Sequence, residues 1–82
     1  MFTVYAISSK TRNYIYVGLT SNLEKRIEFH NKGYERTTCP YRPFRLIYIE
    51  KYADRPSARI REKYLKSASG KSFLKSLQKQ DK

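Results

Sequence analysis

One carboxylate stands where an apolar side chain is expected. Ala58, Glu62 and Leu65 fall at positions i, i+4 and i+7 of a predicted helix over residues 54–67, so they share one face. A buried carboxylate without a partner is strongly unfavourable. Glu62 must therefore meet a cation, either an arginine, a lysine or a metal ion. The spacing alone favours a salt bridge with an arginine.

A guanidinium and an imidazole share the edge of another predicted helix, which runs to about residue 31. Leu23 and Ile27 form its apolar stripe, and Arg26 and His30 are i, i+4 neighbours beside that stripe. Both side chains point toward the same patch. The ordinary alternatives are a solvated arginine and a histidine near the negative end of the helix dipole.

Tyrosines recur on two strands that are predicted to form a hairpin, over residues 2–8 and 14–20. Tyr14 and Tyr16 alternate along the second strand and share one face, and Tyr5 lies on the neighbouring strand. Half-buried packing is the usual role of strand tyrosines. Phenols that converge with a guanidinium and a carboxylate would instead form a site.

The elements that must position these side chains follow in a definite order. A basic loop over residues 34–43 leads to a third strand over 44–52 and the helix over 54–67, and a short helix over about 69–80 follows. This order predicts an α/β (α+β) fold, with a small three-stranded, largely antiparallel sheet flanked by three helices. We expect one domain over residues 1–82.

Several local signals predict where the helices begin and end. Ser21 and Glu24 fit a capping box before the first helix, and Gly33 is expected to stop it. Asp54 is expected to cap the second helix. We expect Ser69 and Gly70 to interrupt the helical pattern and so separate the second helix from the third.

Composition narrows the class of partner. The chain of 82 residues carries 18 Lys and Arg against 7 Asp and Glu, a formal net charge of +11. So much positive charge favours a polyanion, and eight Tyr and four Phe offer surfaces on which bases can stack. We expect a nucleic acid, before an acidic protein or an anionic membrane surface.

The sequence also argues against membrane-spanning, disulfide-bonded and secreted proteins. No apolar run approaches the ~20 residues that cross a bilayer, and no long basic amphipathic helix of the membrane-surface type stands out, so we expect no membrane partner. Cys39 is the only cysteine, which excludes an internal disulfide and a zinc site of several cysteines. The first ten residues have no signal-peptide pattern, and we expect a cytoplasmic protein.

These residues, in this order, resemble the GIY-YIG nuclease superfamily. Thr3-Val4-Tyr5 and Tyr16-Val17-Gly18 resemble its paired strand motif, with ten residues between the two tyrosines. Arg26 stands where the family has its arginine, and His30 where relatives have Tyr or His. Glu62 matches the metal-binding glutamate. The resemblance covers residues 2–66 and is strongest with small, excision-nuclease-like bacterial members.

The resemblance implies an endonuclease that hydrolyses DNA phosphodiester bonds with Mg²⁺ or Mn²⁺, in DNA repair or processing. By position, Glu62 would ligate the metal ion and Arg26 would bind the scissile phosphate. Tyr5, Tyr16 and His30 would position or deprotonate the attacking water. A lone carboxylate suffices for Mg²⁺ only where water and substrate oxygens complete its coordination.

Two departures keep an alternative open. Thr3 replaces the first glycine of the family motif, which changes little chemistry. Leu19 stands where some catalytic relatives carry a lysine that helps to activate water. The alternative is a nuclease fold that acts only as a nucleic-acid-binding module. A protein-interaction role, in which the charge serves an acidic partner, is the third hypothesis.

Overall fold

The computed structural model describes the backbone of residues 1–80 and the side chains of residues 1–77. Its elements are β1 (Phe2–Ser9), β2 (Ile15–Thr20), α1 (Leu23–Asn31), a 3-10 turn (Cys39–Tyr41), β3 (Phe44–Tyr52), α2 (Arg55–Lys66) and α3 (Ala68–Gln80). The predicted order and the α+β class are confirmed. Among residues 1–80, no helix is long and apolar enough to span a membrane.

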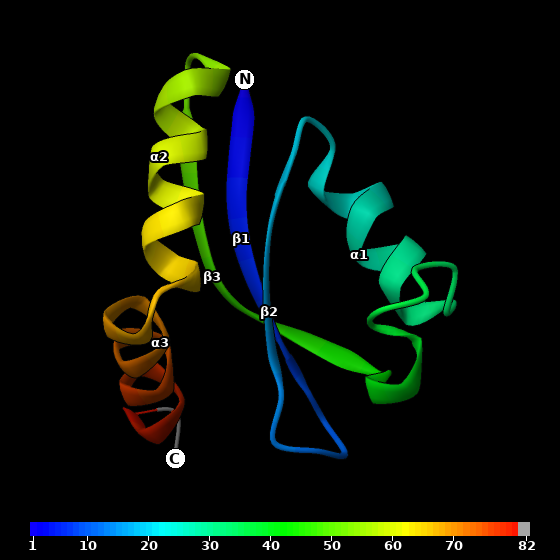
Figure 1. Ribbon diagram of the computed structural model, residues 1–82. Helices are drawn as coiled ribbons and strands as arrows, with labels where there is room; N and C mark the ends of the chain where they lie inside the picture. The colour runs from blue at the N-terminus through cyan, green and yellow to red at the C-terminus, as the bar shows by residue number, and fades with distance from the viewer. Residues whose placement is uncertain (81–82) are drawn as a thin grey trace.

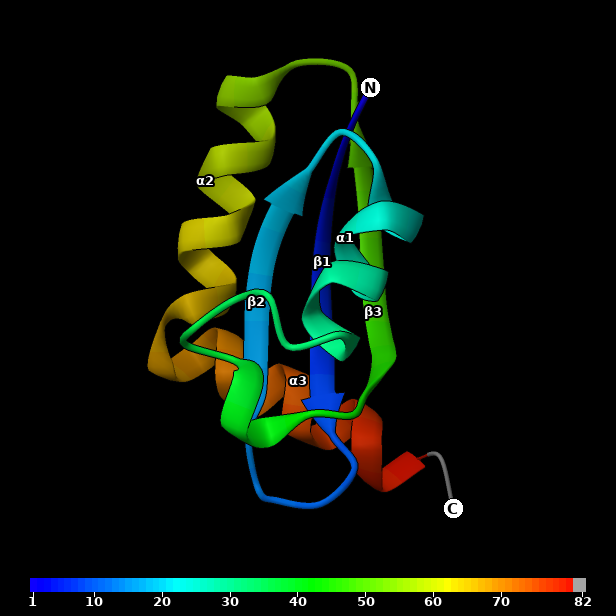
Figure 2. The same ribbon diagram turned by 90° about the vertical axis from the view of Figure 1, so that its right-hand side faces the viewer.

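The three strands form an antiparallel sheet in the order β2-β1-β3, with β1 in the centre. Helix α1 covers one face of the sheet, and α2 and α3 cover the other (Figures 1 and 2). Consecutive side chains of β1 therefore enter two different hydrophobic clusters. Val4 packs with residues of α2 and α3, whereas Tyr5 packs with residues of α1.

The first helix begins one residue later than the capping box predicts. Asn22 is the N-cap, in an extended conformation, and its side-chain oxygen accepts a hydrogen bond from the Lys25 backbone N–H at 3.2 Å. Ser21 is therefore outside the helix, and that prediction was wrong. Asparagine and serine are equally good N-caps, so the sequence could not decide between neighbours. The end of α1 is as predicted, with Gly33 at φ +82°.

The junction between α2 and α3 also differs from the prediction. Asp54 caps α2 as expected and accepts from the Ser57 N–H at 2.8 Å. Helix α2 ends at Lys66, however, and Ser67 separates it from α3, so that Gly70 lies within α3. A Cβ at Gly70 would overlap the backbone of α2 at Leu65. This glycine allows two helices to approach closely, and that contact outweighs its poor helix propensity.

Candidate active site

The Tyr5 hydroxyl is the centre of a buried hydrogen-bonded cluster. Tyr5 is fully buried, and its hydroxyl lies 2.9 Å from His30 Nε2. Arg26 Nε donates to the same hydroxyl at 3.4 Å. Gly18 pairs with Tyr5 across the two strands, and a Cβ at position 18 would overlap the Tyr5 hydroxyl and ring. Gly18 therefore makes room for the phenol inside the sheet.

His30 is fully buried and is no ordinary helix-end residue. Its Nδ1 lies 2.9 Å from the hydroxyl of Thr38, which is also fully buried. The half-buried ring of Tyr16 packs against the imidazole, with ring centroids 4.9 Å apart. Both nitrogens of His30 thus have a partner, and both tyrosines of the paired strand motif contact the same imidazole.

Arg26 lies at the partly exposed side of this cluster. Its guanidinium forms an ion pair with Glu35 at 3.6 Å and lies over the Phe29 ring, 4.8 Å from the centroid. These contacts hold Arg26 beside the Tyr5 hydroxyl while part of its side chain stays accessible to solvent. A guanidinium in this position can bind a phosphate oxygen.

Burial keeps the phenol and the imidazole neutral at physiological pH. Loss of solvation raises the pKa of Tyr5 to about 12, although the hydrogen bond from Arg26 opposes the rise. Loss of solvation also lowers the pKa of His30 to about 4, and the nearby Arg26 charge lowers it further. A neutral imidazole has one free lone pair, so His30 can accept a proton in passing, although its pKa of about 4 makes the protonated form unfavourable at neutral pH.

Glu62 lies on the buried stripe of α2, as predicted, and its side chain is only 8% exposed. Its carboxylate forms ion pairs with Lys66 at 3.2 Å and Arg59 at 3.6 Å, both on the same helix. Both cations are more than half exposed. The expected arginine partner is present, together with a lysine.

Glu62 makes no hydrogen bond to Tyr5, Arg26 or His30 among the described residues, so the structure joins four of the five predicted site residues directly. Burial is the main cause of the raised Tyr5 pKa, and the negative charge of Glu62 is the smallest contributor. The carboxylate is therefore near enough to affect the phenol electrostatically.

The donor set fits Mg²⁺ or Mn²⁺ bound largely through substrate and water. Residues 1–77 contain no group of three or more His, Cys, Asp or Glu side chains that could hold a metal ion alone. Mg²⁺ is commonly bound by one or two carboxylates and substrate phosphate oxygens. Glu62 offers one such carboxylate, whose present partners are long, exposed side chains that can move away.

Comparison with known families decides the classification. A family model described as the GIY-YIG catalytic domain matches residues 1–77. The chain belongs to the GIY-YIG family. The predicted resemblance is confirmed, and with it the nuclease-like fold.

Individual relatives agree with this family. The chain is 36% identical over 76 residues to a UPF0213 protein of Staphylococcus haemolyticus. This alignment covers 92% of each of the two chains. It is 39% identical over 64 residues to a UPF0213 protein of Clostridium perfringens, which is 77% of this chain and 68% of the relative. The solution structure of a UPF0213 protein from Bacillus halodurans is similar, with a TM-score of 0.56, 30% identity and coverage of 94% of this chain and 85% of that one.

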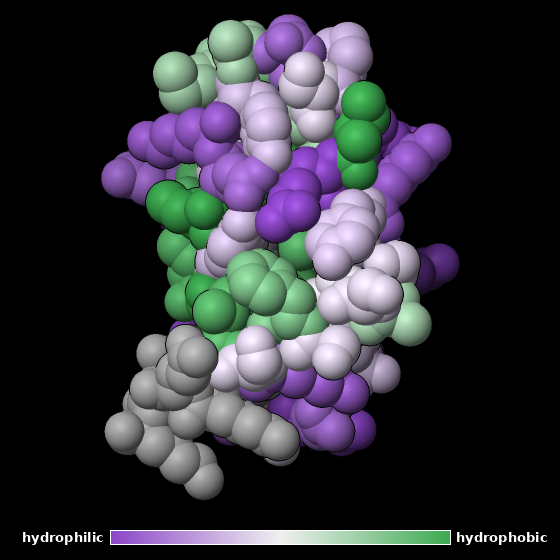
Figure 3. Space-filling view, turned by 90° about the vertical axis from the view of Figure 1, so that its left-hand side faces the viewer, coloured by the Kyte–Doolittle hydropathy of each residue, from purple (hydrophilic) through white to green (hydrophobic). Residues whose placement is uncertain are grey.

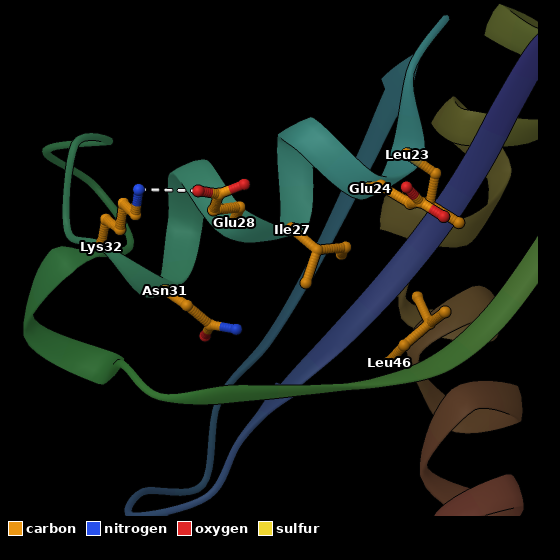
Figure 4. A pocket seen from close by; sticks show the side chains of 7 residues that line it. All are labelled: Leu23, Glu24, Ile27, Glu28, Asn31, Lys32 and Leu46. Atoms are coloured by element: carbon orange, nitrogen blue, oxygen red, sulfur yellow. Dashed lines mark ion pairs between the residues drawn. The ribbon is translucent and has the colours of Figure 1, made fainter.

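A hollow on the surface of this GIY-YIG domain lies away from the cluster. An open groove of about 600 Å³ runs between α1 and β3, lined by Leu23, Ile27 and Leu46 with polar residues at its rim (Figure 4). None of the five predicted site residues lines it. The concave apolar surface and the residues of the family motif are therefore separate features of the molecule.

Sequence reasoning missed two residues of the cluster. Thr38 and Glu35 lie in the segment 34–43, which was predicted as a basic, polar loop. The segment carries no period of apolar residues that would reveal a buried threonine. It nevertheless supplies a hydrogen-bond partner to His30 and an ion-pair partner to Arg26.

Proposed function

We propose that this protein is a divalent-metal-dependent endonuclease that hydrolyses phosphodiester bonds of DNA. The observation that carries the proposal is the Tyr5 hydroxyl, which contacts His30 and Arg26 at once within a GIY-YIG domain. A buried neutral imidazole, a phenol and a guanidinium together can move a proton and stabilise a phosphate. A packing role alone would not require this set of polar groups.

Proton transfer is the task of the buried half of the site. The attacking water loses a proton to the Tyr5 oxygen as the phenol passes its own proton to His30 Nε2, 2.9 Å away. The phenol is neutral again after this exchange, and the charge resides on the imidazole. This route suits Tyr5, because a phenol with a pKa of about 12 is a poor base alone.

Phosphate binding is the task of the charged half. Arg26 would bind a non-bridging oxygen of the scissile phosphate and stabilise the charge that develops there. Glu62 would hold Mg²⁺ or Mn²⁺, which when bound polarises the phosphoryl oxygen and stabilises the leaving oxygen. Lys66 and Arg59 would then release the Glu62 carboxylate to the metal ion.

The charge of the molecule supports a nucleic-acid substrate. Figure 3 shows hydrophilic and hydrophobic side chains side by side on the face of the molecule that α2 and α3 cover. Ile60, Tyr64 and Phe73 are exposed on these two helices, among basic residues of the sequence. On α3, Lys71 and Lys75 line a cavity of about 140 Å³ beside the hairpin. Such basic surfaces bind phosphate backbones, with an affinity that falls as salt rises.

The test is nicking of supercoiled, branched and single-stranded DNA with Mg²⁺ or Mn²⁺. We expect Glu62→Gln to reduce the rate at least ~100-fold, because it removes the carboxylate that holds the metal ion. Glu50→Gln is the matched control, since Glu50 is also a partly buried, ion-paired glutamate, 3.3 Å from Arg61. Loss of cleavage in both variants, or no metal-dependent cleavage by the wild type, would contradict the proposal.

A non-catalytic nucleic-acid-binding module is the second candidate. Leu19, which follows Gly18, favours it, because some catalytic relatives place a lysine there. The ion pairs that already satisfy Glu62 favour it as well. This candidate predicts salt-sensitive DNA binding that Glu62→Gln leaves intact, with no cleavage by the wild type on any of the DNA substrates.

A further inference from the structure

Thr38 joins the segment 34–43 to the centre of the site. It is fully buried, and its hydroxyl lies 2.9 Å from His30 Nδ1 and 3.4 Å from the carbonyl oxygen of Glu35. The side chain of Glu35 meanwhile pairs with Arg26. This segment therefore contacts both partners of the Tyr5 hydroxyl.

Counting protons favours one direction for these hydrogen bonds. The Thr38 hydroxyl has one proton, and the Glu35 carbonyl can only accept it. When the hydroxyl donates to this carbonyl, it accepts from His30, and the imidazole proton then lies on Nδ1. The lone pair of Nε2 therefore faces Tyr5, and the phenol donates its proton to the imidazole.

The opposite tautomer satisfies fewer groups. With the proton on Nε2, the Tyr5 oxygen would accept from both His30 and Arg26. The hydrogen bonds of Tyr5 within the described residues are with these two side chains, so its own proton would have no acceptor. An unsatisfied buried hydroxyl is unfavourable, which favours the first arrangement.

We propose that Thr38 is a positioning residue that holds His30 in the Nδ1–H tautomer and so directs proton transfer from Tyr5 to His30. The consequence for cleavage rests on the proposed nuclease function, whereas the tautomer itself does not. In the same way, a hydrogen bond from the other ring nitrogen fixes the tautomer of metal-bound histidines. The catalytic His30 comes from α1, and the group that orients it comes from a loop without regular structure over most of its length.

The first test reads the tautomer directly by ¹⁵N NMR of the His30 ring, the only histidine of the chain. We expect the proton on Nδ1 in the wild type and in Thr38→Ser, which keeps the hydroxyl. Thr38→Val keeps the shape and removes the hydroxyl, and we expect the proton to move toward Nε2. A proton on Nε2 in the wild type, or an unchanged tautomer in folded Thr38→Val, overturns the proposal. The wild-type measurement decides even if the valine variant does not fold.

The second test measures the rate of DNA cleavage by the Thr38 variants. We expect Thr38→Val to lower kcat ~10–100-fold with little change in KM, the range seen when the hydrogen-bond partner that orients a functional side chain is lost. Thr38→Ser should recover most of the rate. Full activity in a valine variant whose tautomer has changed would overturn the positioning role. Absence of cleavage in the wild type would contradict the nuclease proposal instead, and the NMR result would still decide the tautomer.

Discussion

The two halves of the candidate site are held in different ways. The Tyr5–His30–Arg26 half is fixed by side chains from β1, α1 and the segment 34–43. Glu62 is also buried, but its ion pairs come from exposed cations one turn away on α2. One half is preorganised by the tertiary fold, and the other can exchange its partners without unfolding.

This difference has an energetic consequence. A satisfied buried network contributes strongly to stability and resists change. Ion pairs with exposed partners contribute only about 0–1 kcal/mol each and can be replaced by other cations. Changes in the first half should therefore alter stability, whereas changes around Glu62 should mainly alter ligand binding.

The pH dependence of stability should separate the two halves most clearly. The pKa of His30 is about 4 in the folded chain against an ordinary value of 6.5. Between these values the unfolded chain binds the extra proton, so stability is full above pH 6.5 and falls as the pH is lowered toward 4. The expected loss is about 3 kcal/mol.

Urea unfolding between pH 4 and 7.5 measures this loss. A His30→Gln variant is the control, because it lacks the titrating group and should lose much less stability over the same range. If the titration of His30 causes the pH dependence, the free energy of unfolding of Glu62→Gln should change with pH between pH 5 and 6.5 as that of the wild type does. A wild-type stability that does not change between pH 6.5 and 4.5 would contradict the buried, neutral imidazole.

The next largest effect should come from Gly18→Ala. A Cβ there would overlap the Tyr5 hydroxyl and ring, so the phenol or the strand must move. We expect a loss of about 1–3 kcal/mol in the free energy of unfolding, the usual range for overpacking.

A double-mutant cycle with Tyr5→Phe tests the cause. Removing the hydroxyl makes room for part of the new methyl group, so the double variant should lose less stability than the sum of the two single variants. Additive losses would show that Gly18 matters for a reason other than its contact with Tyr5.

Regular patterns explain what could be predicted from the sequence. The alternation of β1 and β2 placed Tyr5 and Tyr16 on one face, and the helical spacing placed Glu62 on a buried stripe. The burial of Thr38 could not be predicted, because a loop has no repeating pattern of apolar residues. It depends on how the chain folds over His30. The predicted interruption at Gly70 was wrong because helix propensity is a local property, whereas the close contact of Gly70 with α2 is a tertiary one.

The smallest effect should come from Lys66→Gln. Lys66 is about half exposed, and its ion pair with Glu62 is within one helix, so we expect a change in stability of no more than about 0.5 kcal/mol. Removal of this competing charge should strengthen metal binding at Glu62, and the Mg²⁺ concentration for half-maximal cleavage should fall ~2–3-fold, or about 0.5 kcal/mol. Lys63→Gln is the matched control, because Lys63 lies on the same helix and forms no ion pair with Glu62 among the described residues. An equal shift in both variants would mean that only net charge matters. A loss of stability above ~1 kcal/mol in Lys66→Gln would contradict the exchangeable character of the Glu62 half.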